Sequence, residues 1–93
     1  ELRPATKREI IVRMLRNLVG VSMRTGATEN PIHYLDTILA LDPQAPMERW
    51  SRAMLRLREG DDKGGKEDLE WLLDHTPEGI DMQRVREIYR SLR

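Results

Sequence analysis

The sequence predicts an all-α fold of five helices, in which two helical hairpins are followed by a single C-terminal helix. One observation behind this prediction is a repeat of 34 residues, which is typical of stacked helical hairpins. The recurring pairs are Gly26 and Gly60, Leu35 and Leu69, Leu39 and Leu73, and Pro43 and Pro77. A second observation is that apolar residues recur at three- and four-residue steps, whereas no segment alternates as a strand does.

The first helix is expected to begin after Thr6 and to run to about Arg24. Thr6 and Glu9 form a capping box, in which each side chain accepts a hydrogen bond from the other residue's backbone amide. Gly26 then ends the helix. Its apolar residues are Ile11, Met14, Leu15, Leu18, Val19 and Met23.

The second helix is expected between Asn30, which caps it, and Asp42, which precedes a proline and is therefore pushed out of helical conformation. Pro31 suits the first helical position because its missing amide hydrogen is not needed there. The third helix is expected from Pro46 to Gly60. Its apolar stripe is Trp50, Ala53 or Met54, and Leu57.

Residues 61–65 are expected to form a turn before the fourth helix, which carries Leu69, Leu72 and Leu73 and ends at Thr76. Asp81 is expected to cap the fifth helix. The apolar face of that helix is Met82, Val85, Ile88, Tyr89 and Leu92. Because two hairpins are fewer than a repeat array usually needs, this helix is expected to cover the last hairpin.

The expected organisation is a linker over residues 1–5 and one domain over residues 6–93. The domain divides into repeat one at about 6–43, repeat two at about 46–77, and a capping helix at about 81–93. Cysteine is absent and no apolar run approaches a membrane span, so disulfides, thiolate zinc sites and a membrane-spanning segment are not expected. A start at Glu1 rather than a methionine favours a piece of a longer protein.

These residues resemble the tetratricopeptide repeat (TPR) family. Residues of the first repeat that fall at consensus positions are Leu15, Leu18, Gly26, Leu35, Ile38 and Pro43. The sequence departs from the family where the helices cross, at Pro31 and Gly65, and the opening helix of the second repeat fits only after a one-residue shift. The resemblance implies a right-handed superhelical stack that binds protein or peptide.

Three segments also resemble the C-terminal half of the bacterial Sir-type invasion-regulator family: KREIIVRMLRNLVG, ERWSRAMLRLREG and EDLEWLLDHTPEG. In that family a transglutaminase-like domain precedes a short TPR tail. The resemblance implies a bacterial, cytoplasmic protein in which this chain is an accessory domain. The residues of a transglutaminase-like site are not carried over, because the chain contains no cysteine.

The charges sum to zero but alternate by segment, with basic residues in the first and third helices and acidic residues in the second and fourth. In TPR domains the first helix of each hairpin lines a groove, so the resemblance implies a basic groove. Its expected residues are Arg13, Arg16, Asn17, Gly20, Arg24 and Arg58. Guanidinium forks suit carboxylates, so the expected partner is an acidic peptide, or an acidic surface of the parent's own N-terminal domain. The alternative is that these arginines pair with the chain's own acids, Glu29, Asp36, Glu67 or Asp68.

Trp50 and Met54 admit two interpretations. The strict 34-residue register places them on the groove face, as an apolar partner or homodimer interface. That register also buries Arg49, Arg52 and Arg56, which costs several kcal/mol for each charge that finds no partner. A one-residue shift makes Trp50 and Met54 ordinary core.

No enzymatic activity, cofactor or metal is expected. His33 and His75 have no further ligand at a suitable spacing, and Glu67, Asp68 and Glu70 have the pattern of a solvated helix face. Nucleic acid is a competing partner because arginine is abundant, but the basic first helix lacks the aromatic residues that stack on bases.

Overall fold

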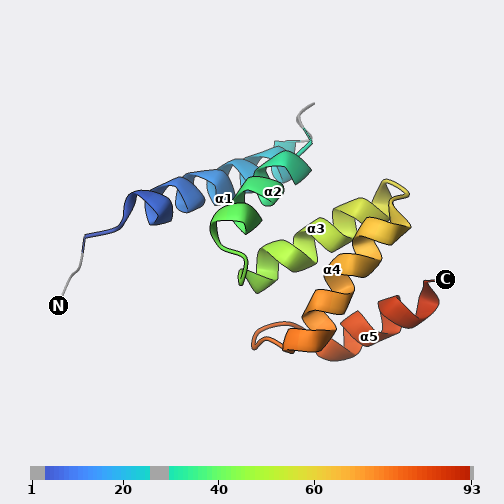
Figure 1. Ribbon diagram of the computed structural model, residues 1–93. Coiled ribbons are helices and arrows are strands. Elements are labelled where there is room, and N and C mark those ends of the chain that lie inside the picture. The colour runs from blue at the N-terminus through green and yellow to red at the C-terminus, as the bar shows by residue number, and fades with distance from the viewer. Residues whose placement is uncertain (1–3, 26–29, 93) are drawn as a thin grey trace. The chain divides into compact units, whose positions relative to one another are not determined.

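The computed structural model describes residues 4–25 and 30–92, and these form five α-helices without any strand. The helices are α1 (Lys7–Thr25), α2 (Ile32–Leu41), α3 (Pro46–Arg58), α4 (Asp62–His75) and α5 (Met82–Ser91) (Figure 1). The all-α prediction is therefore confirmed. Residues 1–3 of the expected linker, Gly26, Glu29 and Arg93 lie outside the described residues. The chain divides between Gln44 and Ala45 into two compact units, and the superhelical stack stays a prediction.

The first unit contains the hairpin of α1 and α2, and these two helices pack against each other. The predicted capping box opens α1: the Glu9 amide donates to Thr6 Oγ1 at 3.1 Å, and the Thr6 amide donates to Glu9 Oε1 at 3.0 Å. The N-cap of α2 is Pro31 rather than the predicted Asn30, but Asn30 Oδ1 still accepts a hydrogen bond from the Ile32 amide at 3.0 Å, at the first residue of the helix. The buried residues of these two helices are Val12, Ser22, Leu35, Ile38 and Leu39.

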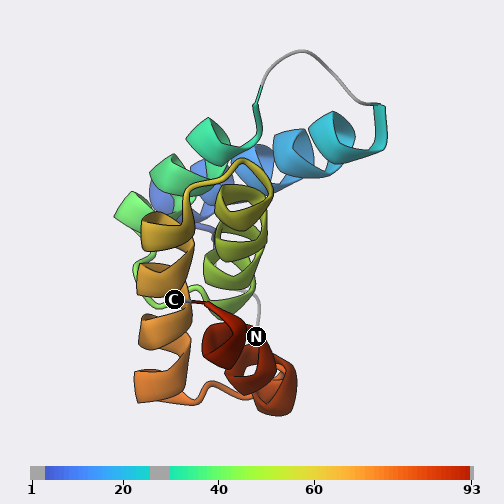
Figure 2. The ribbon, with the colours of Figure 1, turned by 90° about the vertical axis from the view of Figure 1, so that its right-hand side faces the viewer.

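The second unit contains α3, α4 and α5, with α3 and α5 both packed on α4 (Figure 2). Its core is a cluster of Ala53, Leu69, Leu72 and Val85, which come from all three helices. Asp81 caps α5 as predicted, because its Oδ1 accepts from the Arg84 amide at 3.2 Å.

The prediction of a turn over residues 61–65 is wrong, because α4 already begins at Asp62. Asp61 caps this helix by accepting a hydrogen bond from the Gly64 amide at 2.9 Å. Gly65 therefore lies inside α4, where a Cβ would come within 2.6 Å of the Leu57 side chain and 3.3 Å of the Ala53 carbonyl oxygen. The glycine lets α3 and α4 approach closely, as a small residue at a helix crossing should.

The 34-residue period of the sequence is also a period of burial. Leu35 and Leu69 are 1% and 0% exposed, and Ile38 and Leu72 are both 0% exposed. The second helix of each hairpin thus turns the same residues inward. No helix among the described residues is long and apolar enough to cross a membrane.

Candidate functional site

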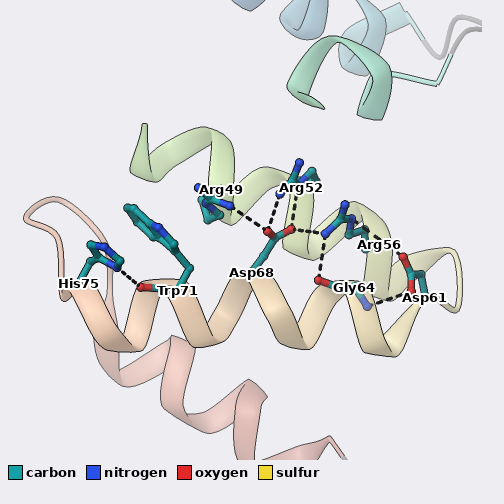
Figure 3. A network of polar contacts seen from close by, with 8 residues as sticks. All are labelled: Arg49, Arg52, Arg56, Asp61, Gly64, Asp68, Trp71 and His75. Carbon is teal, nitrogen blue, oxygen red and sulfur yellow. Dashed lines mark hydrogen bonds and ion pairs between the residues drawn. The ribbon is translucent and has the colours of Figure 1, made fainter. Parts of the chain in front are cut away.

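A buried carboxylate lies between α3 and α4 and gathers arginines around it (Figure 3). Asp68 is only 1% exposed. Arg52 approaches it with both arms of its guanidinium fork, Nε to Oδ2 at 3.0 Å and Nη2 to Oδ1 at 2.9 Å. Paired bonds of this kind are among the stronger polar contacts in proteins.

Two further arginines complete this network. Arg56 Nη1 donates to Asp68 Oδ2 at 3.1 Å and to the Gly64 carbonyl oxygen at 3.1 Å. Arg49 Nη1 lies 3.6 Å from Asp68 Oδ1. The three arginines follow one another at three- and four-residue steps, so they occupy one face of α3. We call these residues, with Asp68, the arginine network.

Arg49 also belongs to a stack of flat groups (Figure 3). Its guanidinium carbon lies 4.5 Å from the Trp71 ring centroid, and the His75 ring stacks on Trp71 at 3.9 Å between centroids. His75 Nδ1 is 2.8 Å from the Trp71 carbonyl oxygen, which fixes the imidazole. Burial lowers the pKa of the Arg49 guanidinium from its usual value, Asp68 opposes this shift, and the neighbouring cations Arg52 and Arg56 add to it.

The prediction that Asp68 lies on a solvated face is therefore wrong. Arg49, Arg52 and Arg56 face α4, as the strict 34-residue register expects. Asp68 supplies a negative charge there, which offsets the free-energy cost of burying these cations. Trp50 and Met54 are half-buried and pack against the core cluster, which is the environment that the core interpretation expects. The row of arginines at helical spacing was the signal that could have pointed to a buried acid.

On α1, two of the predicted groove residues line one hollow. Arg13 and Arg16 border a hollow of about 500 Å³ together with Arg8 and with Asp42, which follows α2. The Arg16 Nη2 atom lies 3.7 Å from Asp42 Oδ2, and both side chains are nearly half exposed. We call this surface the basic hollow.

The remaining predicted groove residues lie elsewhere. Asn17 and Arg24 are exposed on α1, and Arg24 Nη1 passes 3.8 Å from the position that a Cβ on Gly20 would take. Arg58 is exposed on the last turn of α3, in the second unit. Within the first unit, the structure thus brings Arg13 and Arg16 together and leaves Asn17 and Arg24 outside the lining of the basic hollow.

Next to its basic side, α1 exposes a row of large apolar side chains. These are Ile10, Ile11, Met14, Leu18 and Val21, each between 38% and 61% exposed. Within the described part of the chain, no three His, Asp or Glu side chains gather where they could hold a metal ion. The chemistry available on α1 is therefore charge pairing beside apolar contact, which suits a protein or peptide ligand.

Comparison with known proteins also indicates a chain that binds protein or peptide. Two Xylella fastidiosa proteins described as UPF0162 protein, from strains 9a5c and Temecula1, are each 34% identical over 85 residues. The match covers 91% of this chain but only 30% of each relative's length. No solved structure matches. A tetratricopeptide repeat family model matches residues 21–90, which is most of the chain, so the chain belongs to the tetratricopeptide repeat family, whose members generally mediate protein–protein interaction.

Proposed function

We propose that this chain is a docking module that binds an acidic peptide, or an acidic protein surface, at the basic hollow of α1. The observation that carries the proposal is the charge around this hollow. Arg8, Arg13 and Arg16 surround it, against the carboxylates of Glu9 and Asp42. Three cations against two carboxylates leave this lining with a net positive charge, which favours an incoming anion.

A ligand can replace the ion pair within the hollow at little cost in free energy. The ion pair of Arg16 and Asp42 is long and exposed, and such pairs contribute about 1 kcal/mol or less to stability. A ligand carboxylate that meets a guanidinium fork with two hydrogen bonds can replace it. The arginine network of α3 offers no such exchange, because its carboxylate is buried and held by several bonds.

A titration tests this proposal. A fluorescein-labelled acidic peptide is titrated with the 93-residue chain in about 50 mM salt, and its anisotropy is expected to rise. Arg13→Gln and Arg16→Gln should each weaken binding, whereas Arg84→Gln, which removes an exposed arginine of α5, should not. Absence of any affinity at this salt concentration would remove the proposal.

A second candidate function is that of an accessory domain that stabilises or dimerises a larger transglutaminase-like protein. Two observations favour it: the resemblance of three sequence segments, and the fact that the chain spans only 30% of the length of the relatives it matches. The sequence encoded upstream of Glu1 tests it directly, since this candidate requires a domain with a reactive cysteine and a histidine there.

The dimer form of this second candidate places Trp50 and Met54 in the contact. Light scattering on Trp50→Ala separates the two interpretations of these residues. A variant that stays folded and becomes monomeric would support a dimer contact, whereas a variant that loses its fold would support the packing against the core cluster.

A further inference from the structure

The basic hollow already contains a carboxylate of the chain itself. Asp42 lines the hollow together with Arg16, and Arg16 Nη2 lies 3.7 Å from Asp42 Oδ2. Both residues belong to the first unit, and nearly half of each side chain is exposed to solvent. Asp42 therefore lies where an incoming carboxylate would meet Arg16.

The second unit shows how closely a carboxylate can engage an arginine of this protein. Arg52 donates to Asp68 from Nε at 3.0 Å and from Nη2 at 2.9 Å. The distance of 3.7 Å between Arg16 and Asp42 is longer than an ordinary hydrogen bond. A ligand carboxylate that reaches Arg16 with two hydrogen bonds would therefore bind it more strongly than Asp42 does.

The position of Asp42 at the end of α2 makes it a competitor that is always present. Its backbone amide donates to the Ile38 carbonyl oxygen at 2.7 Å, so the helix end holds the backbone of Asp42 beside α1. A carboxylate on the same chain has a high effective concentration at Arg16, which compensates for the poor geometry of its contact.

Helix α2 gains nothing from the charge of Asp42. The carbonyl groups of the last helical turn carry partial negative charge, which disfavours a carboxylate at the C-cap. No basic residue lies in the last turn of α2 to offset this repulsion. The cations of the basic hollow are what make a carboxylate favourable at this position.

We propose that the ion pair of Arg16 and Asp42 is autoinhibitory, because Asp42 competes with the ligand for Arg16. This inference rests on the proposed function, the docking of an acidic segment at the basic hollow, and adds what limits the affinity of that site. Removing the carboxylate of Asp42 should strengthen binding, whereas removing a guanidinium of the hollow should weaken it.

Asp42→Asn tests the inference, because asparagine keeps the shape of the side chain and removes its charge. The probe is a fluorescein-labelled peptide of alternating Glu and Gly, and its anisotropy is followed as the 93-residue chain is added in about 50 mM salt. Asp42→Asn should bind this peptide about fivefold more tightly than the unsubstituted chain, since an exposed ion pair is worth up to about that factor.

Two controls separate competition for Arg16 from a change in net charge. Asp74→Asn removes an exposed carboxylate of α4, outside the hollow, and should change the affinity by less than about twofold. In an Arg16→Gln background, Asp42 has no guanidinium at this position to compete for, so Asp42→Asn should again change the affinity by less than about twofold. Circular dichroism should show the same helix content in all variants, because the pair is exposed.

Three results would overturn the inference. Binding by the unsubstituted chain with no gain in Asp42→Asn would remove the competition and leave the docking proposal standing. An equal gain from Asp42→Asn with and without Arg16 would show attraction by net charge alone. Absence of affinity in both the unsubstituted chain and Asp42→Asn would remove the docking proposal, and this inference with it.

Discussion

The two hairpins carry different kinds of residue at positions that are equivalent by the 34-residue repeat. In the second hairpin, Arg49, Arg52 and Arg56 of α3 converge on Asp68 of α4. The positions 34 residues earlier hold Leu15, Leu18, Ser22 and Tyr34. The first hairpin therefore has no counterpart of the arginine network, and its arginines lie on other faces of α1, where they are exposed.

This difference separates arginines that hold the fold from arginines that are available to a partner. A buried carboxylate with several guanidinium partners specifies how α3 and α4 meet, since any other register would leave charges buried without compensation. Helix α1 is instead joined to α2 through apolar and small residues such as Val12 and Ser22. Its arginines are exposed, and the proposed function assigns Arg13 and Arg16 to a partner.

The largest expected effect comes from breaking the arginine network. Asp68→Asn keeps the shape of the side chain but removes the charge that three guanidinium groups share, so the free energy of unfolding should fall by about 3–5 kcal/mol. Urea denaturation followed by tryptophan fluorescence measures this, because both tryptophans, Trp50 and Trp71, lie in the second unit. Glu67→Gln, at the exposed neighbouring acid, should change stability by less than about 0.5 kcal/mol. Equal stability of both variants would mean that the network does not hold the hairpin.

Glycine substitutions compare the packing of the two hairpins, with a smaller expected effect. Gly65→Ala places a methyl group 2.6 Å from Leu57, so overpacking should cost about 1–3 kcal/mol. Gly20→Ala on α1 meets only Arg24 at 3.8 Å and should stabilise the helix by up to about 1 kcal/mol, because alanine is the better helix former. Thermal unfolding followed by circular dichroism measures both. A stabilising Gly65→Ala would contradict the close approach of α3 and α4.

The smallest expected effect concerns the contact between α4 and α5. The Tyr89 hydroxyl donates to Glu70 Oε2 at 2.8 Å, and this bond, with desolvation and the charges of Glu70 and Asp74, raises the pKa of Tyr89 above its usual 10.0. Because the pKa is raised in the folded state, the bond stabilises the fold below about pH 10 and is lost as the pH rises through the folded value. In a Tyr34→Phe background, tyrosinate absorbance should show Tyr89 ionising at lower pH after Glu70→Gln. An unchanged titration would show that the bond is absent in solution.

The sequence was sufficient to predict the helices because their signals are local. The capping box at Thr6 and the side-chain hydrogen bonds of Asn30 and Asp81 lie within one turn of chain, and the buried pairs follow from the 34-residue repeat. The arginine network was not predicted: its arginines have helical spacing, but Asp68 was expected on a solvated face. Asp68 lies among other acids in the sequence, but it shares the buried face of α4 with Gly65, where α3 approaches closely.

The candidate site was predicted only in part, for a related reason. Arg13 and Arg16 were expected to share a surface, and they line the same hollow. The apolar residues of α1, however, form a single stripe by periodicity, whereas Ile11, Met14 and Leu18 are exposed and Val12 is buried. The packing of the hairpin decides which residues of a broad apolar stripe meet the other helix. The spacing of apolar residues along the sequence does not predict this packing.

A matched pair of variants tests most directly whether the two sets of arginines have different roles. Arg52→Gln and Arg13→Gln each remove one guanidinium, and each variant is measured for urea unfolding and for affinity to the acidic peptide. Arg52→Gln should lower the free energy of unfolding by about 2–3 kcal/mol and leave affinity unchanged, because its bonds to Asp68 are internal. Arg13→Gln should leave stability within about 0.5 kcal/mol and weaken binding about tenfold. The opposite pattern, with Arg13→Gln unfolding the chain and Arg52→Gln losing the peptide, would contradict the division of roles.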